Sequence, residues 1–340
     1  MKKEESKVIA QKLQKIPNGT LALKHCRAGG TGNTLFGEQF RAVTAGKGCV
    51  EAYETFPGIE VSFNVFLASE VKFRHDASDS VLEIYYCRSG RVGWNMQGGT
   101  AVYLGTGDVT AHSMACCADS AMMFPLGYSE GISISVDLKQ LSSICPEVLK
   151  NAGVEADQLR DRFCSGKPSA IPSCSDLEHI FAPLFSAPVS VRISLLKLKV
   201  LEILIYLSNM KLEHKELTQY FSQQTELIKE IHQQLTEHLD QRFTIAELSK
   251  QYLINTSTLK EIFKAVYGQP IATYMKEFRV RQAMKLLRET NATIADIASQ
   301  VGYQTQGKFS SAFQSIVKMS PREYRKIQGI APSDSFSKTL

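Results

Sequence analysis

The sequence predicts an α+β protein with an N-terminal antiparallel β barrel or jelly roll, a helical linker and a C-terminal all-α domain. Three observations predict it. Apolar residues follow a period of two between about residues 59 and 137, a helical period follows from residue 189, and one helical motif occurs twice near the end. The 340 residues suffice for two cores. We therefore expect domains at 1–185 and 223–330, joined by a linker at 186–222.

The predicted barrel is built from short strands separated by glycine-rich breaks. Six segments alternate in hydropathy: Glu60–Leu67, Val81–Tyr86, Arg91–Asn95, Ala101–Leu104, Ala121–Phe124 and Gly131–Val136. Short strands that recur every eight to twelve residues are typical of an antiparallel barrel or jelly roll. A barrel of this size can enclose a small effector among apolar walls with a few polar anchors.

The linker is predicted to contain a long apolar helix. One apolar row has the alternating steps of four and three that characterise a coiled coil: Val189, Ile193, Leu196, Val200, Ile203, Leu207 and Met210. A second row comprises Leu195, Leu198, Leu201 and Ile205. We expect one row to dock on the barrel and the other to pair two subunits, with dimerisation through Leu196 and Ile203. The alternative is a helix buried on both sides within one monomer. Residues 210–222 are more polar and are expected to form a hinge.

The predicted C-terminal domain contains the same motif twice. Thr244-Ile-Ala-Glu-Leu-Ser and Thr293-Ile-Ala-Asp-Ile-Ala each open a short amphipathic helix. Both read as capping boxes, because the Thr hydroxyl can accept from the backbone while Glu247 or Asp296 accepts in return. A second helix follows each one, and an uninterrupted helical pattern over 271–290 separates the copies. Two helix-turn-helix units indicate binding to double-stranded DNA.

The C-terminal residues resemble the AraC/XylS family of bacterial transcription regulators. The resemblance is clearest in Ile294–Tyr303, Lys308–Phe313 and Ser320–Arg325, and it covers about 105 residues. It implies a DNA-binding regulator, more often an activator, that acts with RNA polymerase. Members usually carry Gly where Lys318 stands, and basic residues where Glu261 and Ser311 stand.

Residues expected to contact DNA are those left exposed once the core positions of the second helices are removed. The candidates for reading bases are Thr256, Ser257, Lys260, Glu261, Gln304, Gln306, Gly307, Ser310 and Ser311. Lys260 can donate to guanine, Gln306 can pair with adenine, and Glu261 can accept from cytosine. Lys264, Arg279 and Lys308 are expected to hold phosphates.

Charge favours the same interpretation. Residues 223–328 contain 15 Lys and Arg against 10 Asp and Glu, whereas the remainder contains equal numbers of each. All of the net charge of +5 therefore lies in the predicted DNA-binding domain, where it can neutralise phosphates. A basic helical surface that only faces solvent would show the same imbalance of charge. The doubled helix-turn-helix motif is therefore the observation that favours DNA binding.

The segment His75–Gly90, followed by Leu104–Asp108, resembles the cupin-type effector domain that precedes many AraC-type modules. Effector-binding candidates are His75, Glu83 and Trp94, although Trp94 also suits core packing. A cupin metalloenzyme would need converging ligands. Only His75, Glu83 and His112 are available and no His-x-His pair occurs, so we expect no metal, no cofactor and no enzymatic activity.

Cysteine usage and apolar runs constrain the remaining alternatives. The eight cysteines form no C-x-x-C pair, so neither a zinc site nor a disulfide framework is expected. Cys116-Cys117 leaves open a thiol redox switch. No run of about 20 apolar residues could cross a membrane, and no leader is apparent. We expect a cytoplasmic, homodimeric regulator that binds a small-molecule effector.

Overall fold

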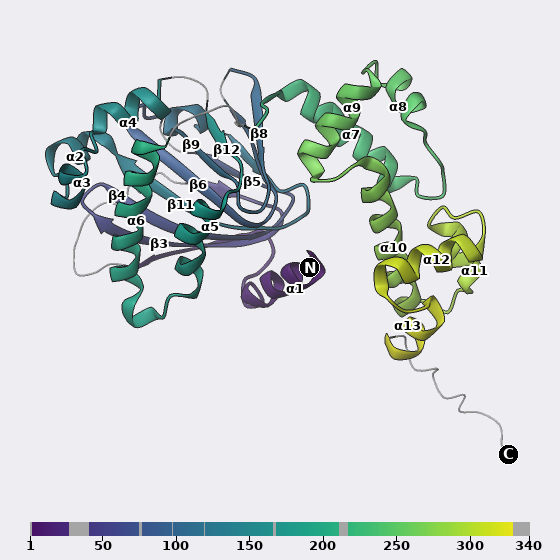
Figure 1. Cartoon of the computed structure of the whole chain (residues 1–340). Coiled ribbons are helices and arrows are strands. Elements are labelled where there is room, and N and C mark those ends of the chain that lie inside the picture. Colours follow the sequence, from purple (N-terminus) through teal and green to yellow (C-terminus); the bar gives the residue numbers. More distant parts are fainter. Residues whose placement is uncertain are drawn as a thin grey trace. The chain divides into compact units, whose positions relative to one another are not determined.

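A computed structural model describes residues 2–26, 41–74, 77–96, 98–118, 120–165, 168–210 and 217–328. The chain divides into two compact units, Met1–Gln223 and Gln224–Leu340 (Figure 1). Among the residues described, none of the helices combines the length and apolar character needed to span a bilayer.

The N-terminal unit contains two sheets. The larger has the order β1-β3-β4-β11-β6-β9-β12 and the smaller β13-β8-β7-β10-β5-β2. The larger sheet comprises β1 (Thr20–Cys26), β3 (Lys47–Phe56), β4 (Ile59–Leu67), β6 (Val81–Gly90), β9 (Val109–Ser113), β11 (Ser129–Asp137) and β12 (Ser169–Ile171). The smaller comprises β2 (Arg41–Val43), β5 (Glu70–Arg74), β7 (Val92–Met96), β8 (Thr100–Leu104), β10 (Ala121–Met123) and β13 (Tyr220–Phe221).

The six strands predicted from alternation are present as β4, β6, β7, β8, β10 and β11. Among the described strands, β1 runs parallel to β3 and the other pairings are antiparallel. The unit is therefore a mixed, mainly antiparallel β domain.

Helices cover one face of the larger sheet. They are α2 (Leu138–Ser143), α3 (Glu147–Asn151), α4 (Ala156–Phe163), α5 (Ser175–Phe181) and α6 (Arg192–Asn209), with the 3-10 turns η2 (Ala182–Ser186) and η3 (Val189–Val191) beside them (Figure 1). Ile9 of helix α1 (Lys2–Lys12) and Leu13, which follows the helix, pack beside Tyr128 instead. The sheet face under α2–α6 is apolar because Val61, Ile84 and Ile134 point into that core.

The apolar seam of α6 belongs to this core. Leu196, Val200, Ile203 and Leu207 are at most 2% exposed and pack with residues of the same unit. The expectation that Leu196 and Ile203 form a dimer interface is therefore wrong. A helix docked on a sheet has the same spacing of apolar residues as a coiled coil, so the sequence pattern fitted both arrangements. Leu198 of the second row remains 65% exposed.

The C-terminal unit is all-α. It comprises α7 (Ser222–Glu237), α8 (Ile245–Gln251), α9 (Thr256–Tyr267), α10 (Ile271–Glu289), α11 (Ile294–Gln300), α12 (Gln306–Val317) and α13 (Pro321–Gln328). Helix α10 packs against both helix-turn-helix units. Its first half places Tyr274 against Phe263 of α9, and its second half packs Leu287 with Ile297, Phe309 and Phe313.

Candidate functional site

Each predicted helix-turn-helix unit is present, and both capping boxes form. Thr244 Oγ1 accepts from the Glu247 amide (3.2 Å) while Glu247 Oε2 accepts from the Thr244 amide (2.7 Å). Thr293 and Asp296 repeat the exchange at 3.1 and 3.2 Å. These bonds satisfy backbone donors that the start of a helix leaves unpaired. The first helix of each unit, α8 or α11, is thereby fixed in position for its second helix, α9 or α12.

The second helices begin at side-chain caps. Asn255 Oδ1 accepts from the Thr258 amide (2.8 Å), and Thr305 Oγ1 accepts from the Lys308 amide (3.3 Å). Apolar residues on one side of each helix, such as Leu259 and Phe309, are fully buried. These buried residues anchor one side of each helix in the domain core, and the other side of its N-terminal turns faces solvent.

Most residues expected to contact DNA lie on that exposed side. Exposed are Thr256, Ser257, Lys260, Glu261, Lys264, Gln304, Gln306, Gly307, Lys308 and Ser311, and Ser310 is half-buried. Subtracting the core positions therefore identified a surface that the structure leaves open. Their contacts with bases or phosphates stay a prediction.

Arg279 also makes contacts within the domain. Its guanidinium donates to the backbone carbonyls of Gln241 (2.9 Å) and Gly302 (3.5 Å), and burial lowers its pKa. The side chain thus joins the turn of the second unit to the segment that follows α7. These bonds give Arg279 a structural part in the domain, and its contact with a phosphate stays a prediction.

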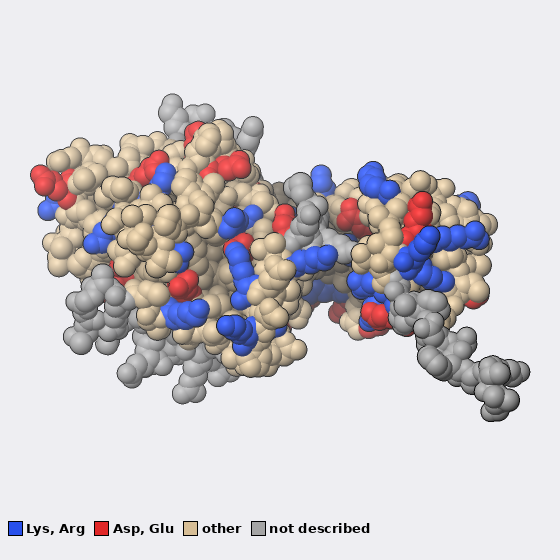
Figure 2. All heavy atoms as spheres, turned by 90° about the horizontal axis from the view of Figure 1, so that it is seen from below, with Lys and Arg blue, Asp and Glu red and all other residues tan. Residues whose placement is uncertain are grey.

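The surface charge of the C-terminal unit is mixed. Figure 2 shows Lys and Arg side chains spread over the face of this unit in that view, with Asp and Glu side chains among them. Phosphate contacts would come from individual lysines beside helix N-termini, such as Lys308 in the first turn of α12.

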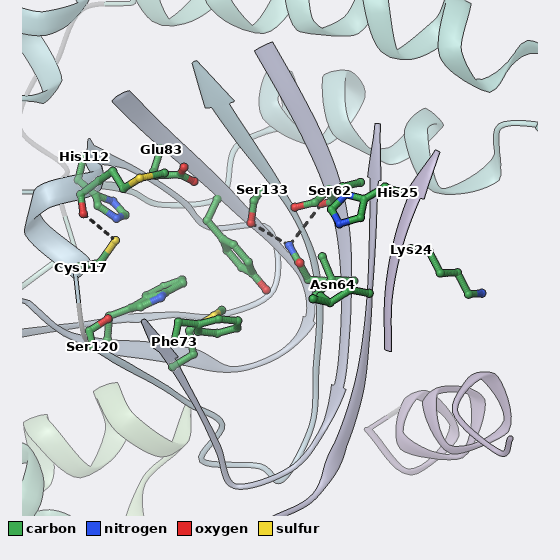
Figure 3. Close-up of a pocket in the computed structure, with 17 residues that line it drawn as sticks. Lys24, His25, Ser62, Asn64, Phe73, Glu83, His112, Cys117, Ser120 and Ser133 are labelled. Carbon is green, nitrogen blue, oxygen red and sulfur yellow. Dashed lines mark hydrogen bonds between the residues drawn. The ribbon is translucent and has the colours of Figure 1, made fainter. Parts of the chain in front are cut away.

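The N-terminal unit contains a cavity of about 250 Å³. Its lining comes from both sheets and from η1 (Met114–Cys117): Leu23, Lys24, His25, Val50, Ala52, Ser62, Asn64, Phe73, Glu83, Tyr85, Trp94, His112, Met114, Cys117, Ser120, Met122 and Ser133 (Figure 3). Two of the three effector-binding candidates, Glu83 and Trp94, line it. His75 lies outside the described residues.

A polar row crosses the cavity side of the larger sheet. The strand register aligns Glu60 with Ser135, Ser135 with Glu83, and Glu83 with His112. Paired residues of antiparallel strands point to the same face, so these side chains are neighbours. Burial raises the pKa of Glu83 to about 8, a value that includes a lowering by the Ser135 hydroxyl and a smaller increase by the nearby Glu60 carboxylate. Glu83 Oε1 is buried and has no hydrogen-bond partner.

His112 is held by Thr110. The Thr110 hydroxyl donates to the Ser169 carbonyl (3.0 Å), so its contact with His112 Nδ1 (3.4 Å) has the histidine as donor. The lone pair of a neutral ring is then on Nε2. Within the described parts of the chain, no three metal-ligating side chains converge.

Several lining residues escaped the sequence analysis. Asn64 Nδ2 donates to Ser133 Oγ (2.8 Å) and to the Ser62 carbonyl (3.3 Å). The ring of Tyr85 lies edge-on to Trp94, with centroids 5.0 Å apart. The available signal was the set of polar residues that alternate with apolar ones in β4 and β11, which otherwise suggests a face turned to water.

Comparisons with known proteins concern the C-terminal unit. Residues 248–327 match the family model of a helix-turn-helix domain. A putative AraC-like transcription regulator of Streptomyces lividans is 40% identical over 84 residues, which are 25% of this chain and 28% of the relative. The HTH-type transcriptional activator RhaR of Mannheimia succiniciproducens is 34% identical over 91 residues, 27% of this chain and 33% of the relative.

Among solved structures, the C-terminal domain of AraT, a response regulator from Geobacillus stearothermophilus, has 26% identity. It covers 33% of this chain and 93% of that chain, with a TM-score of 0.31. The chain thus spans about a third of the length of the curated relatives it matches.

Proposed function

We propose that this chain is a ligand-responsive transcription regulator that binds specific DNA sites through its AraC-type C-terminal domain. Activation together with RNA polymerase is the mode we favour, and a DNA-binding role places the protein in the cytoplasm with its target. The observation that carries the proposal is the pair of capped second helices, α9 and α12, each with buried apolar residues below and exposed polar residues at its N-terminal turns.

The exposed side chains suit the reading of DNA. Lys260 offers donors to guanine O6 and N7, and the Gln306 amide offers both a donor and an acceptor to adenine. Lys264 and Lys308 are available for phosphates, which fix the register of the helices without reading sequence. Successive major grooves on one face of the duplex lie about 34 Å apart, and α10 is a rigid spacer between the two reading units.

The cavity of the N-terminal unit supports the ligand-responsive part of the proposal. It is small, walled by aromatic and apolar groups, and supplied with a few polar anchors, as effector sites are. Occupancy of the cavity would act by favouring one arrangement of the chain over another.

The two alternative functions receive less support. Burial raises the pKa of the Cys117 thiol, which disfavours the reactive thiolate that a redox switch at Cys116-Cys117 would need. A metalloenzyme would need a third ligand beside Glu83 and His112, and His75 lies outside the described residues. The relatives found are regulators, so we propose a non-enzymatic role.

We also propose that the protein is a homodimer, but with an interface formed by the second apolar row of α6 instead of Leu196 and Ile203. The second row of α6, which contains Leu198, Leu201 and Ile205, borders a groove; Leu198 is exposed, while Leu201 and Ile205 are half-buried against the core. A self-complementary pairing of two such helices would bury Leu198, which one copy alone exposes.

Selection of DNA sites tests the proposal. The full chain should retain a defined duplex from a random pool and bind it more tightly than a shuffled duplex of the same composition. Equal affinity for the selected and shuffled duplexes would reject sequence-specific recognition, and absence of DNA binding would reject the function.

A further inference from the structure

We propose that the cavity of the N-terminal unit binds a small organic ammonium compound with an aromatic or compact apolar body, anchored by Glu83. The identification of this compound as the effector rests on the proposed function. Binding itself is independent of DNA and is testable without it.

The end of the cavity at Glu83 is acidic. Glu60 and Glu83 flank Ser135 in one row across β4, β11 and β6, and Glu60 is 4% exposed. Figure 3 shows Glu83, His112 and Cys117 together at one end of the cavity. Among the residues that the structure describes, this row contains no Lys or Arg, and the lining supplied by the smaller sheet is uncharged.

Two basic lining residues lie at the other end. Lys24 and His25 of β1 are both exposed, and Figure 3 shows the Lys24 side chain directed away from Glu83. Beside Glu83 an anionic group would face a buried acid, and among the described lining residues only His112 lies there to offset it, whereas an ammonium group can pair with the Glu83 carboxylate. Charge complementarity favours the cation.

The polar atoms at this end are also incompletely paired. Glu83 Oε1 is buried without a hydrogen-bond partner. Such groups carry a desolvation cost that a ligand donor can relieve. An ammonium has three donors and can reach more than one acceptor.

The remaining walls select the body of the ligand. Trp94, Tyr85 and Phe73 provide aromatic surface, which attracts cations and apolar groups alike. A volume of about 250 Å³ corresponds to roughly eight water molecules at ~30 Å³ each, so the ligand is small.

Fluorescence titration of the full chain tests the inference, because Trp94 is the single tryptophan and lines the cavity. Three probes of nearly equal shape are compared: 2-phenylethylamine, 2-phenylethanol and phenylacetate. We expect saturable binding of the amine at least about tenfold tighter than the alcohol, as a charge-assisted hydrogen bond requires, with the acid weakest. Tightest binding of phenylacetate, equal binding of amine and alcohol, or an amine that leaves Trp94 fluorescence unchanged would overturn it.

Two variants test whether Glu83 binds the ammonium group. Glu83→Gln keeps the side-chain shape and should abolish the preference for the amine over the alcohol, while Glu54→Gln, an exposed residue paired with Glu60 in the register, should retain it. An amine preference that survives in Glu83→Gln would overturn the assignment of the anchor. Probe selectivity of the wild type does not depend on either variant folding. DNA affinity of the same preparations, measured without probe, reports separately on the proposed function.

Discussion

Leu253 and Gly302 occupy the same place in the two helix-turn-helix units and share a left-handed backbone. Each directly follows the C-terminal cap of the first helix, with φ of 51° at Leu253 and 80° at Gly302. Their surroundings differ. Leu253 is 94% exposed, whereas a Cβ on Gly302 would lie 2.0 Å from the Leu239 carbonyl oxygen.

The two positions should respond oppositely to substitution. Gly302→Ala should lower the free energy of unfolding by at least about 2 kcal/mol, because both the backbone and the Leu239 carbonyl oppose a side chain. Leu253→Gly should leave stability unchanged or raise it by up to about 1 kcal/mol, since relief of the left-handed strain outweighs the added chain entropy. Urea denaturation of the full chain measures both. A tolerated Gly302→Ala would contradict the geometry of the second turn.

Base reading is tested on the selected duplex. Lys260→Ala and Gln306→Ala should each weaken binding by roughly 1–3 kcal/mol and relax the preference at one base pair. Gln314→Ala, which is exposed near the other end of α12, should leave affinity unchanged. Binding to a library of single base-pair changes provides the readout. An equal loss on every duplex would assign Lys260 and Gln306 to the phosphate backbone.

Substitutions in the two apolar rows of α6 should have different effects, one on folding and the other on dimerisation. Leu196→Asp places a charge in the core and should abolish cooperative folding or cost several kcal/mol. Leu198→Asp changes an exposed side chain and should leave the fold intact, but it should convert a dimer to a monomer. Sedimentation equilibrium with circular dichroism checks both. A dimer that persists in Leu198→Asp would remove the second row from the proposed interface.

Glu83 should make stability depend on pH. Its pKa is raised from 4.5 to about 8 in the folded chain, so folding favours the protonated form. The stabilisation is complete below about pH 4.5 and is lost as the pH rises towards 8. His112 on β9, Glu60 on β4 and Cys117 on η1 lie around the same carboxyl group, and the charge of Glu60 contributes to the raised pKa of Glu83.

The comparison with Glu83→Gln isolates this contribution. The wild type should lose roughly 2–4 kcal/mol relative to Glu83→Gln between pH 5 and pH 8 in urea denaturation. The same linkage predicts that amine binding strengthens with pH up to about 8, while 2-phenylethanol binding does not change. Parallel stability curves for the two proteins would show that Glu83 is not buried as described.

The sequence predicted the C-terminal domain well because each motif that identifies it spans only a few consecutive residues. A capping box spans four residues, so Thr244 with Glu247 and Thr293 with Asp296 could be recognised without the fold. Exposure of Lys260 and Gln306 followed from helical periodicity alone.

The N-terminal site was harder because it depends on pairing between distant strands. Ser133 and Asn64 alternate with apolar residues as solvent-facing residues do, and only the second sheet makes their face an interior. The register that sets Glu83 beside His112 joins residues 29 positions apart. Likewise, the spacing of Leu196 and Ile203 fits both a coiled coil and a helix docked on a sheet, and tertiary packing decides between them.

The most direct test of the account is the salt dependence of affinity between the full chain and its selected duplex. A plot of log affinity against log salt should fall linearly, with a slope of about −0.9 for each phosphate contacted, and Lys308→Ala should reduce the slope by about 1. Specific binding with that dependence would support recognition of DNA by α9 and α12. No affinity for the duplex, or an affinity that salt leaves unchanged, would contradict it.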